Sequence, residues 1–169
     1  KTNLLRKKKI SKFYGFLTLK FFKKVNLNSN KNFLNQKFKY KFDKYFMCRL
    51  ENKLDSIVYK SYFTESIKEA RNLINQGYVY VNKIKIIKSS FIVKKGDLIT
   101  FDNNIFLALE CNICDLNGKK ISRSIPNFLE INYKTFQILI SESPISEKFV
   151  DVSNFRLDFN KLSKFLYTY

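Results

Sequence analysis

The sequence of 169 residues contains no histidine and no tryptophan, and it has only three cysteines, four glycines and two prolines. Without an imidazole there is no Ser–His or Cys–His catalytic dyad and no zinc site of the usual histidine-containing kind. Three cysteines are too few for a small scaffold held together by disulfides. We therefore expect a chain from a reducing compartment, with no catalytic residues, no metal and no cofactor.

Long apolar runs are missing as well. The longest stretch without a charged residue, Asn72 to Asn82, has eleven residues and includes Asn, Gln and Gly. A membrane-spanning helix needs about 20 mostly apolar residues, so we expect no membrane-spanning segment. A protein that binds a membrane surface would need a long amphipathic helical stripe, which the basic first segment lacks, so we expect no membrane partner. The length itself allows one ordinary domain, or a small domain with extensions, and excludes a large multidomain enzyme.

Positive charge is what the sequence has in excess. Lys and Arg number 32 against 14 Asp and Glu, which gives a formal net charge of +18. Residues 1–48 carry +13 of this charge, residues 49–101 carry +5, and residues 102–169 are neutral. In the first segment lysines alternate with aromatic residues, so the lysines could contact phosphates and the rings could stack on bases. The alternative for the rings is a protein core, but the charge predicts a polyanionic partner.

Codon composition suggests where the chain is encoded. Phe, Tyr, Met, Ile, Asn and Lys, which have AT-rich codons, make up 91 of the 169 residues, and alanine occurs only twice. Such a bias indicates an AT-rich genome, and organellar genomes are a frequent case. The basic first segment has a single arginine, whereas a mitochondrial transit peptide is rich in arginine and serine. We expect an organelle-encoded chain.

Residues 49–101 carry the clearest local signals. Ser66 and Glu69 have the spacing of a capping box, which predicts a helix that runs to about Gln76 and ends at Gly77. A shorter amphipathic helix is expected from about residue 53, because it would bury Leu54, Ile57, Val58 and Phe63. Strands are predicted where the pattern changes to period two or to short apolar runs, at residues 79–81, 84–87, 91–93 and 98–101.

These elements define the expected architecture. The fold class is α+β: a small module of two helices packed on a short sheet over residues 49–101. A basic N-terminal arm of residues 1–48 precedes the module, and a mixed C-terminal extension of residues 102–169 packs on it.

The same segment resembles the RNA-binding module named after small-subunit ribosomal protein S-four. The module's LD-x-V-V-Y, E-A-R and G-x-V-x-V-N-G patterns are matched by Leu54–Tyr59, Glu69–Arg71 and Gly77–Asn82. Lys83 stands where the pattern has its last Gly, which leaves the tight left-handed turn at this point open.

The flanks decide among the families that carry this module. It also occurs in pseudouridine synthases, in bacterial tyrosyl-tRNA synthetases and in a heat-shock protein of stalled ribosomes. Leu50–Asp55, Lys12–Gly15 and Pro126–Asn132 resemble the ribosomal family, with Phe128 in place of a Trp. The length excludes the catalytic domain of a synthase. A free RNA-binding factor that acts on stalled ribosomes stays open as the alternative.

The resemblance implies a structural constituent of the small ribosomal subunit, and not an enzyme. It implies a primary binder of small-subunit rRNA that shapes a multi-helix junction during assembly and supports translation. Neighbouring ribosomal proteins, one of the S-five type among them, are the other expected partners, and no small-molecule substrate is expected. We expect the mitochondrion as its location, with the plastid as the alternative.

Eleven basic residues are the candidates for RNA contact. Arg71 is the sharpest, because it is a motif arginine on a helix face that we expect to be exposed; the alternative is an ion pair with an acid of the same chain. The full set is Lys7, Lys8, Lys9 and Lys12 in the arm, Lys53, Lys60, Lys68 and Arg71 on the two helices, and Lys83, Lys85 and Lys88 on the turn and strand. Because Cys111-x-x-Cys114 lacks a second cysteine pair, buried or idle thiols are expected for Cys48, Cys111 and Cys114.

Overall fold

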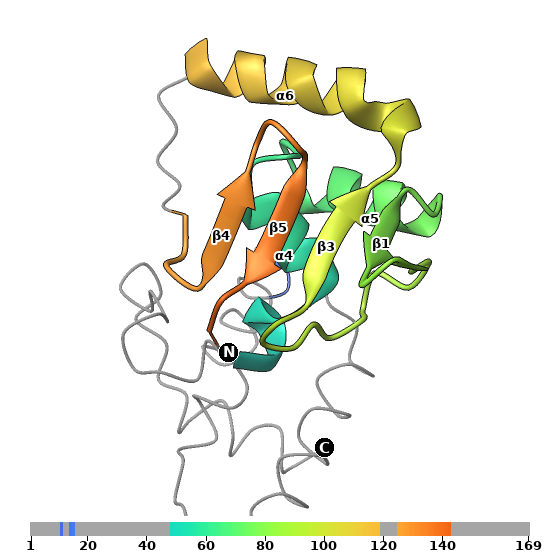
Figure 1. The fold of residues 1–169 in the computed structure, drawn as a ribbon, viewed down its shortest axis with the longest axis vertical. Coiled ribbons are helices and arrows are strands. Elements are labelled where there is room, and N and C mark those ends of the chain that lie inside the picture. Colours follow the sequence, from blue (N-terminus) through green and yellow to red (C-terminus); the bar gives the residue numbers. More distant parts are fainter. Residues whose placement is uncertain (1–10, 12–13, 16–47, 119–124, 143–169) are drawn as a thin grey trace, which may run out of the picture. The chain divides into compact units, whose positions relative to one another are not determined.

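A computed structural model describes residues 11, 14–15, 48–118 and 125–142 (Figure 1). The chain divides into two compact units, one of residues 51–144 and one of residues 1–50 with 145–169. Of the latter unit only residues 11, 14–15 and 48–50 are described; Tyr14 is buried and Gly15 has a left-handed φ of 69°. The fold and the candidate site below belong to the unit of residues 51–144.

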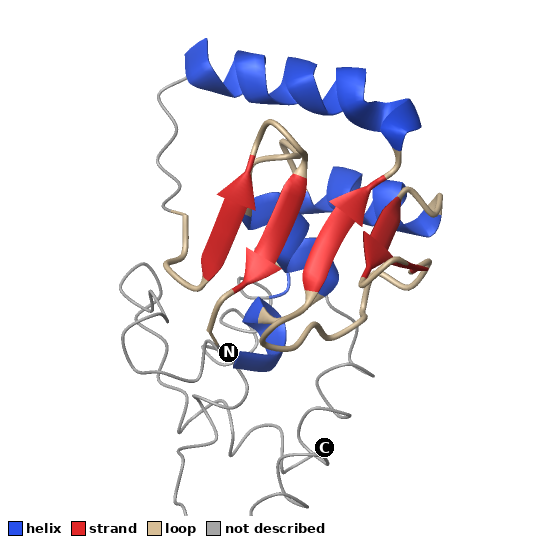
Figure 2. Cartoon of the chain, in the orientation of Figure 1, coloured by secondary structure: helices blue, strands red, loops and turns tan. Residues whose placement is uncertain are grey.

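A single antiparallel sheet organises this unit. Its strands are β1 (Val79–Val81), β2 (Ile84–Lys85), β3 (Leu98–Phe101), β4 (Leu129–Asn132) and β5 (Gln137–Ile140). They lie in the order β2-β1-β3-β5-β4, and every neighbouring pair is antiparallel. Two short helices lie behind the sheet in the view of Figure 2. The predicted α+β class is therefore confirmed.

The two helices are α4 (Leu54–Lys60) and α5 (Ile67–Asn75). Helix α4 buries Leu54, Ile57 and Val58 as predicted, and Phe63 between the helices is fully buried. Helix α5 buries Ile67, Ala70 and Ile74. Ser66 caps α5 as expected, since its Oγ accepts from the Glu69 N–H at 3.2 Å. The Glu69 carboxylate, however, accepts from Glu65 N–H at 2.8 Å, one residue before the cap. Gly77 has a φ of 81° just beyond the helix, as predicted for its end.

The strand predictions were right in part. Residues 79–81 and 98–101 form β1 and β3, and Val79 and Val81 are both buried. Of the predicted strand 84–87, β2 covers Ile84–Lys85, and the Ile86 N–H still donates to the carbonyl oxygen of Val79 at 3.0 Å. The prediction of a strand at residues 91–93 was wrong: Ile92 forms a single bridge with Lys53, and the surrounding bonds run to Leu54 and Asn52. Residues 91–93 are therefore hydrogen-bonded to the residues at the start of α4.

The sheet extends beyond residue 101. Strand β5 pairs with β3 in the register Leu98↔Leu139, and β4 pairs with β5. The core between sheet and helices contains an aromatic cluster around Phe63, whose ring centroid lies 4.9 Å from that of Phe101 and 5.5 Å from that of Tyr133. Phe128, at the position of the family's Trp, is fully buried. Residues 129–140 thus complete the same sheet and core as residues 49–101.

Between β3 and β4 the chain forms the short helix η1 (Asn103–Ile105) and the longer helix α6 (Phe106–Gly118), which lies across one end of the sheet in Figure 1. Its inner face is anchored to the rest of the unit. Leu109 is buried, and the Phe106 ring stacks on Phe136 at 4.5 Å. The Asn112 amide donates to the carbonyl oxygen of Phe63 at 3.1 Å and to Glu69 Oε1 at 2.9 Å.

Candidate nucleic-acid interface

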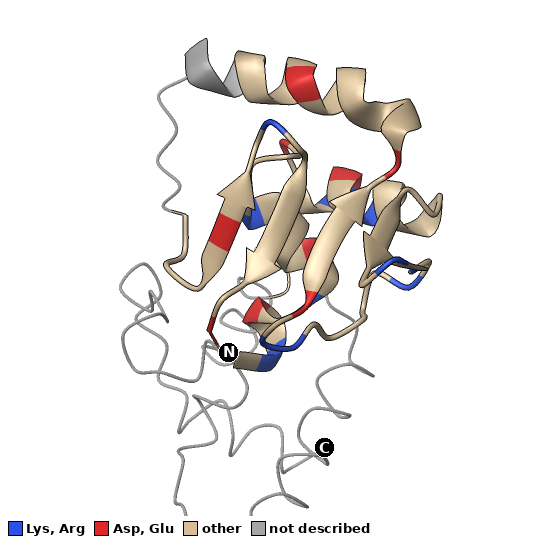
Figure 3. Cartoon of the chain, viewed as in Figure 1, with Lys and Arg blue, Asp and Glu red and all other residues tan. Residues whose placement is uncertain are grey.

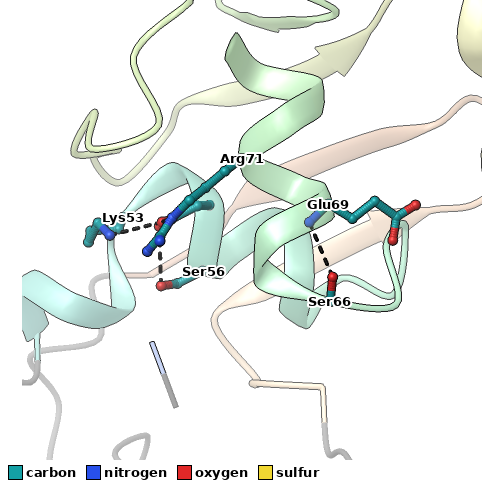
Figure 4. Close-up of polar contacts among 6 residues, drawn as sticks. Lys53, Ser56, Ser66, Glu69 and Arg71 are labelled. Carbon is teal, nitrogen blue, oxygen red and sulfur yellow. Dashed lines mark hydrogen bonds and ion pairs between the residues drawn. The ribbon is translucent and has the colours of Figure 1, made fainter. Parts of the chain in front are cut away.

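A buried ion cluster joins the two helices. The Asp55 side chain is fully buried, and its Oδ2 accepts from Lys53 Nζ at 2.9 Å and from Arg71 Nε at 2.7 Å (Figure 4). A buried carboxylate is tolerated only when cations or donors replace the water it has lost. Asp55 thus holds a cation from the entry of α4 and another from α5, and fixes the two helices against each other.

This cluster contains two of the residues predicted to contact RNA, Lys53 and Arg71, and it gives them a different setting from the one expected. Lys53 is 3% exposed, and burial lowers the pKa of its ammonium, an effect that Asp55 partly offsets. The side chain of Arg71 is 24% exposed and its Nε is bonded to Asp55, so the helix face on which it lies is not the open one that we expected. The alternative, an ion pair with an acid of the same chain, is what the structure contains. Periodicity along α5 could not show this, because Asp55 lies on a different helix.

The other two helical lysines, Lys60 and Lys68, differ from each other in exposure. Lys60 at the end of α4 forms an ion pair with Glu51, and its side chain is 21% exposed. Lys68, in the first turn of α5, is exposed. Of the four helical cations that we predicted to contact RNA, Lys68 is therefore the one with an open side chain.

Besides the helical cations, a basic segment follows β1. Residues 83–95 contain five lysines and no acid, and all five are exposed. Figure 3 shows blue in the β1–β2 hairpin, where β2 forms the edge of the sheet, and again in the loop that leads into β3. We call these five side chains the hairpin lysines: Lys83, Lys85, Lys88, Lys94 and Lys95. The first three are among the predicted RNA contacts; Lys94 and Lys95 were missed, although the charge run of residues 83–95 is readable in the sequence.

Two hydrogen-bonded turns present part of this set together. Asn82 Nδ2 donates to Asp97 Oδ1 at 2.9 Å, and Asn82 Oδ1 accepts from Leu98 N–H at 3.0 Å. Asp97 Oδ2 in turn accepts from Lys94 N–H at 2.8 Å. The Asn82 amide therefore holds the turn that carries Lys83 beside the turn that carries Lys94 and Lys95.

Lys83 occupies a backbone position that favours glycine. Asn82 and Lys83 have φ values of 50° and 68°, the two positive angles of the tight turn between β1 and β2. The sequence did not decide whether this left-handed turn forms without the family's Gly. The structure contains the turn, with Lys83 at the Gly position. A left-handed residue with a side chain costs roughly 1–2 kcal/mol. Because strained residues of this kind are often kept for a function, we infer that the charge of Lys83 is used.

Lys85 also borders the end of α5. A Cβ at Gly77 would collide with the side chain of Lys85. The Lys85 side chain therefore packs against Gly77, the residue that ends α5. Cations near a helix C-terminus are favoured by the helix dipole, which gives Lys85 a structural role besides its exposed charge.

The remaining candidates cannot be placed. Lys7, Lys8, Lys9 and Lys12 lie outside the described residues. Within the described residues, no three His, Cys, Asp or Glu side chains gather as a metal site would require. Cys48 is buried, whereas Cys111 and Cys114 are exposed on α6. No helix among the described residues has the length and apolar character to cross a membrane.

Comparison with known proteins identifies the module in this unit. A family model described as the S4 domain, the S-four module above, matches residues 53–99, from Lys53 beside Asp55 to the middle of β3. A protein of Reclinomonas americana named small ribosomal subunit protein uS4m is 31% identical over 170 residues, which cover 97% of this chain and 64% of that relative.

Two further relatives extend the comparison. A small ribosomal subunit protein uS4m of Marchantia polymorpha is 31% identical over 81% of this chain and 66% of its own length. A small ribosomal subunit protein uS4 of Sphingopyxis alaskensis is 37% identical over 76% of this chain and 59% of its own length. The chain thus spans less than two thirds of the length of these relatives. With the S4 module in the middle and similarity reaching far beyond it, the chain belongs to the uS4 family of small ribosomal subunit proteins.

Proposed function

We propose that this chain is a structural constituent of the small ribosomal subunit and binds its rRNA. The observation that carries the proposal is the S4 module with its exposed hairpin lysines, in a chain of net charge +18. Relatives named small ribosomal subunit protein support it over most of the chain. In this role the protein acts by binding and shape and performs no catalysis.

The proposed interface works mainly through phosphates. Lysine side chains that neutralise phosphates release counterions, and this gain does not depend on base sequence. RNA helices have a deep, narrow major groove that side chains cannot read, so contacts to phosphates and 2′-hydroxyls report the shape of the RNA. Lysines on two turns suit recognition of RNA shape, because the bonds of Asn82 to Asp97 and Leu98 hold the two turns beside each other before RNA binds. A rigid set of this kind would hold the angle of a multi-helix junction during assembly.

Lys53 and Arg71 have a different part in this proposal. Their bonds to Asp55 set the position of α4 against α5, and with it the position of Lys68 and of strand β1, which follows α5. We therefore count Lys68 and the hairpin lysines as direct contacts, with Lys7, Lys8, Lys9 and Lys12 of the arm added from the charge pattern alone. Lys60 and Arg71 are ion-paired and partly exposed, so a direct RNA contact is a secondary role for them in this proposal. Lys53 is buried and supports the interface by holding Asp55.

We place the protein in the mitochondrion. The AT-rich codon bias supports an organellar gene, and the relatives from Reclinomonas americana and Marchantia polymorpha carry the name uS4m. A plastid ribosome is the alternative. A neighbouring protein of the S-five type belongs to the same proposal, as do the other proteins of the small subunit.

The RNA proposal is tested by binding of the full chain to a transcript of the small-subunit rRNA at several salt concentrations. A triple variant, Lys83→Gln with Lys88→Gln and Lys95→Gln, should lower the slope of log affinity against log salt by about 2–3. The matched control is Lys134→Gln. Lys134 is an exposed lysine in the β4–β5 turn, at the opposite end of the sheet from Lys83, and should leave the slope unchanged. Equal slopes for the triple variant and the control would contradict the proposed interface.

A further inference from the structure

The outward face of α6 is apolar. Leu107 is 78% exposed, more than any other large hydrophobic side chain among the described residues. Cys111 and Cys114 are exposed too, and with Leu107 they stand at positions i, i+4 and i+7 of the helix. Residues at this spacing share one face, so they form a continuous stripe. The opposite face is the one anchored through Leu109 and Asn112.

The charge beside this stripe is negative. The described side chains of α6, those of residues 106–114, include the exposed Glu110 and no lysine or arginine. Figure 3 shows red and no blue on this part of the helix. Glu110 lies three residues after Leu107 and four before Cys114, so it borders the stripe. A phosphate backbone would meet this carboxylate and no cation on the helix, which makes the face unsuited to RNA.

We propose that the outward face of α6, with Leu107, Cys111 and Cys114 at its centre, docks a neighbouring protein of the subunit whose apolar contact surface is flanked by Lys or Arg. Protein interfaces have an apolar centre with few charges, and opposite charges at the rim favour the correct partner. Leu107 and the two thiols supply that centre, and the exposed Glu110 beside them supplies negative charge at the rim. The inference rests on the proposed function, since the neighbour is a component of the same small subunit.

The two exposed thiols allow a direct test. The purified full chain, its complex with the rRNA transcript, and small subunits that contain the chain are each treated with N-ethylmaleimide, and the labelled cysteines are identified by mass spectrometry. We expect Cys111 and Cys114 to be labelled in the purified chain and in the rRNA complex, and to lose labelling in the complete subunit. The buried Cys48 serves as the unreactive reference.

Several results would overturn the inference. Full labelling in the complete subunit would mean that the face stays open. Protection already in the rRNA complex would mean that RNA covers it, and protection in the purified chain would mean that the chain's own residues do. Absence of the chain from the small subunit would instead refute the proposed function, and this inference with it.

A pair of variants separates docking from folding. Leu107→Lys places a cation on the stripe and should restore labelling of Cys111 and Cys114 in the subunit, while rRNA affinity of the purified chain is unchanged. Leu107→Met keeps the apolar character and should behave as the natural chain. Because Leu107 is largely exposed, neither variant should unfold α6. Continued thiol protection in subunits that carry Leu107→Lys would contradict the docking surface.

Discussion

Arg71 on α5 donates from its Nε to Asp55 Oδ2 on α4 at 2.7 Å, and Lys53 bonds the same oxygen at 2.9 Å. One carboxylate therefore satisfies two cations from different parts of the chain. The motif arginine of the S4 module is committed here to the arrangement of the helices, and the exposed charge of the module lies mostly on the hairpin lysines.

The first prediction concerns this cluster. Asp55→Ala leaves the buried Lys53 without its carboxylate and should lower the free energy of unfolding by about 3–5 kcal/mol. Arg71→Ala should cost less, about 1–3 kcal/mol, because Asp55 keeps Lys53 and Arg71 is partly exposed. Urea denaturation of the full chain measures both. Lys68→Ala on the same helix is the control, with a change within about 0.5 kcal/mol. Equal stability of all three variants would show that the cluster does not support the fold.

The second prediction concerns the positive φ of Lys83. Lys83→Gly should stabilise the protein by about 0.5–1 kcal/mol, since the relief of the left-handed strain exceeds the entropy that Gly adds to the unfolded chain. The same variant should weaken rRNA binding and lower its salt slope by about 0.7–0.9, the share of one phosphate contact.

Lys83→Asn separates the two effects, because Asn tolerates the left-handed region but carries no charge. It should bind rRNA like Lys83→Gly. If the glycine variant bound rRNA as tightly as the natural chain, the lysine would serve no RNA contact.

The third prediction concerns pH. Burial lowers the pKa of Lys53 below its usual 10.5, so over the interval up to 10.5 the unfolded chain binds more protons than the native one. Stability contributed by this group should therefore rise with pH across that interval. In Lys53→Met the group is absent, so the stability of the natural chain relative to this variant should increase from pH 8 to pH 10.

Urea midpoints of the two proteins at each pH measure this difference. The pKa values of Tyr80, raised by its bond to Asp102, and of Tyr133, raised by burial, oppose the trend in both proteins and cancel in the comparison. A difference that falls with pH would contradict the sign derived from the burial of Lys53.

The fourth prediction concerns the arm. Residues 1–24 contain nine Lys and Arg and no acid. If they contact RNA, their deletion releases fewer counterions and should flatten the salt dependence of rRNA binding. Binding measured at several salt concentrations tests this, and an unchanged slope would mean that the arm does not lie on the RNA.

Much of the module could be predicted because its signals are local. The cap of Ser66, the end of α5 at Gly77 and the strand at residues 79–81 each depend on a few adjacent residues, and all were found in the structure. The strand predicted at residues 98–101 was found as β3, in which Ile99 and Phe101 are buried.

The failures depended on contacts distant in sequence. Arg71 is paired with Asp55, sixteen residues earlier on another helix, and no pattern within α5 reveals that partner. Ile92 has the residue type of a strand, but its neighbours bond to the entry of α4. The resemblance at residues 126–132 did not show that β5 would pair with β3, because sheet order follows from packing between distant segments.

The most direct test of the account is sedimentation of a lysate through a sucrose gradient after a high-salt wash, with this chain quantified in each fraction. The account predicts constant, stoichiometric migration with the small ribosomal subunit that survives the wash. A pool near the top of the gradient, or salt-sensitive attachment to large subunits alone, would mean a transient factor and would contradict the proposal of a structural constituent.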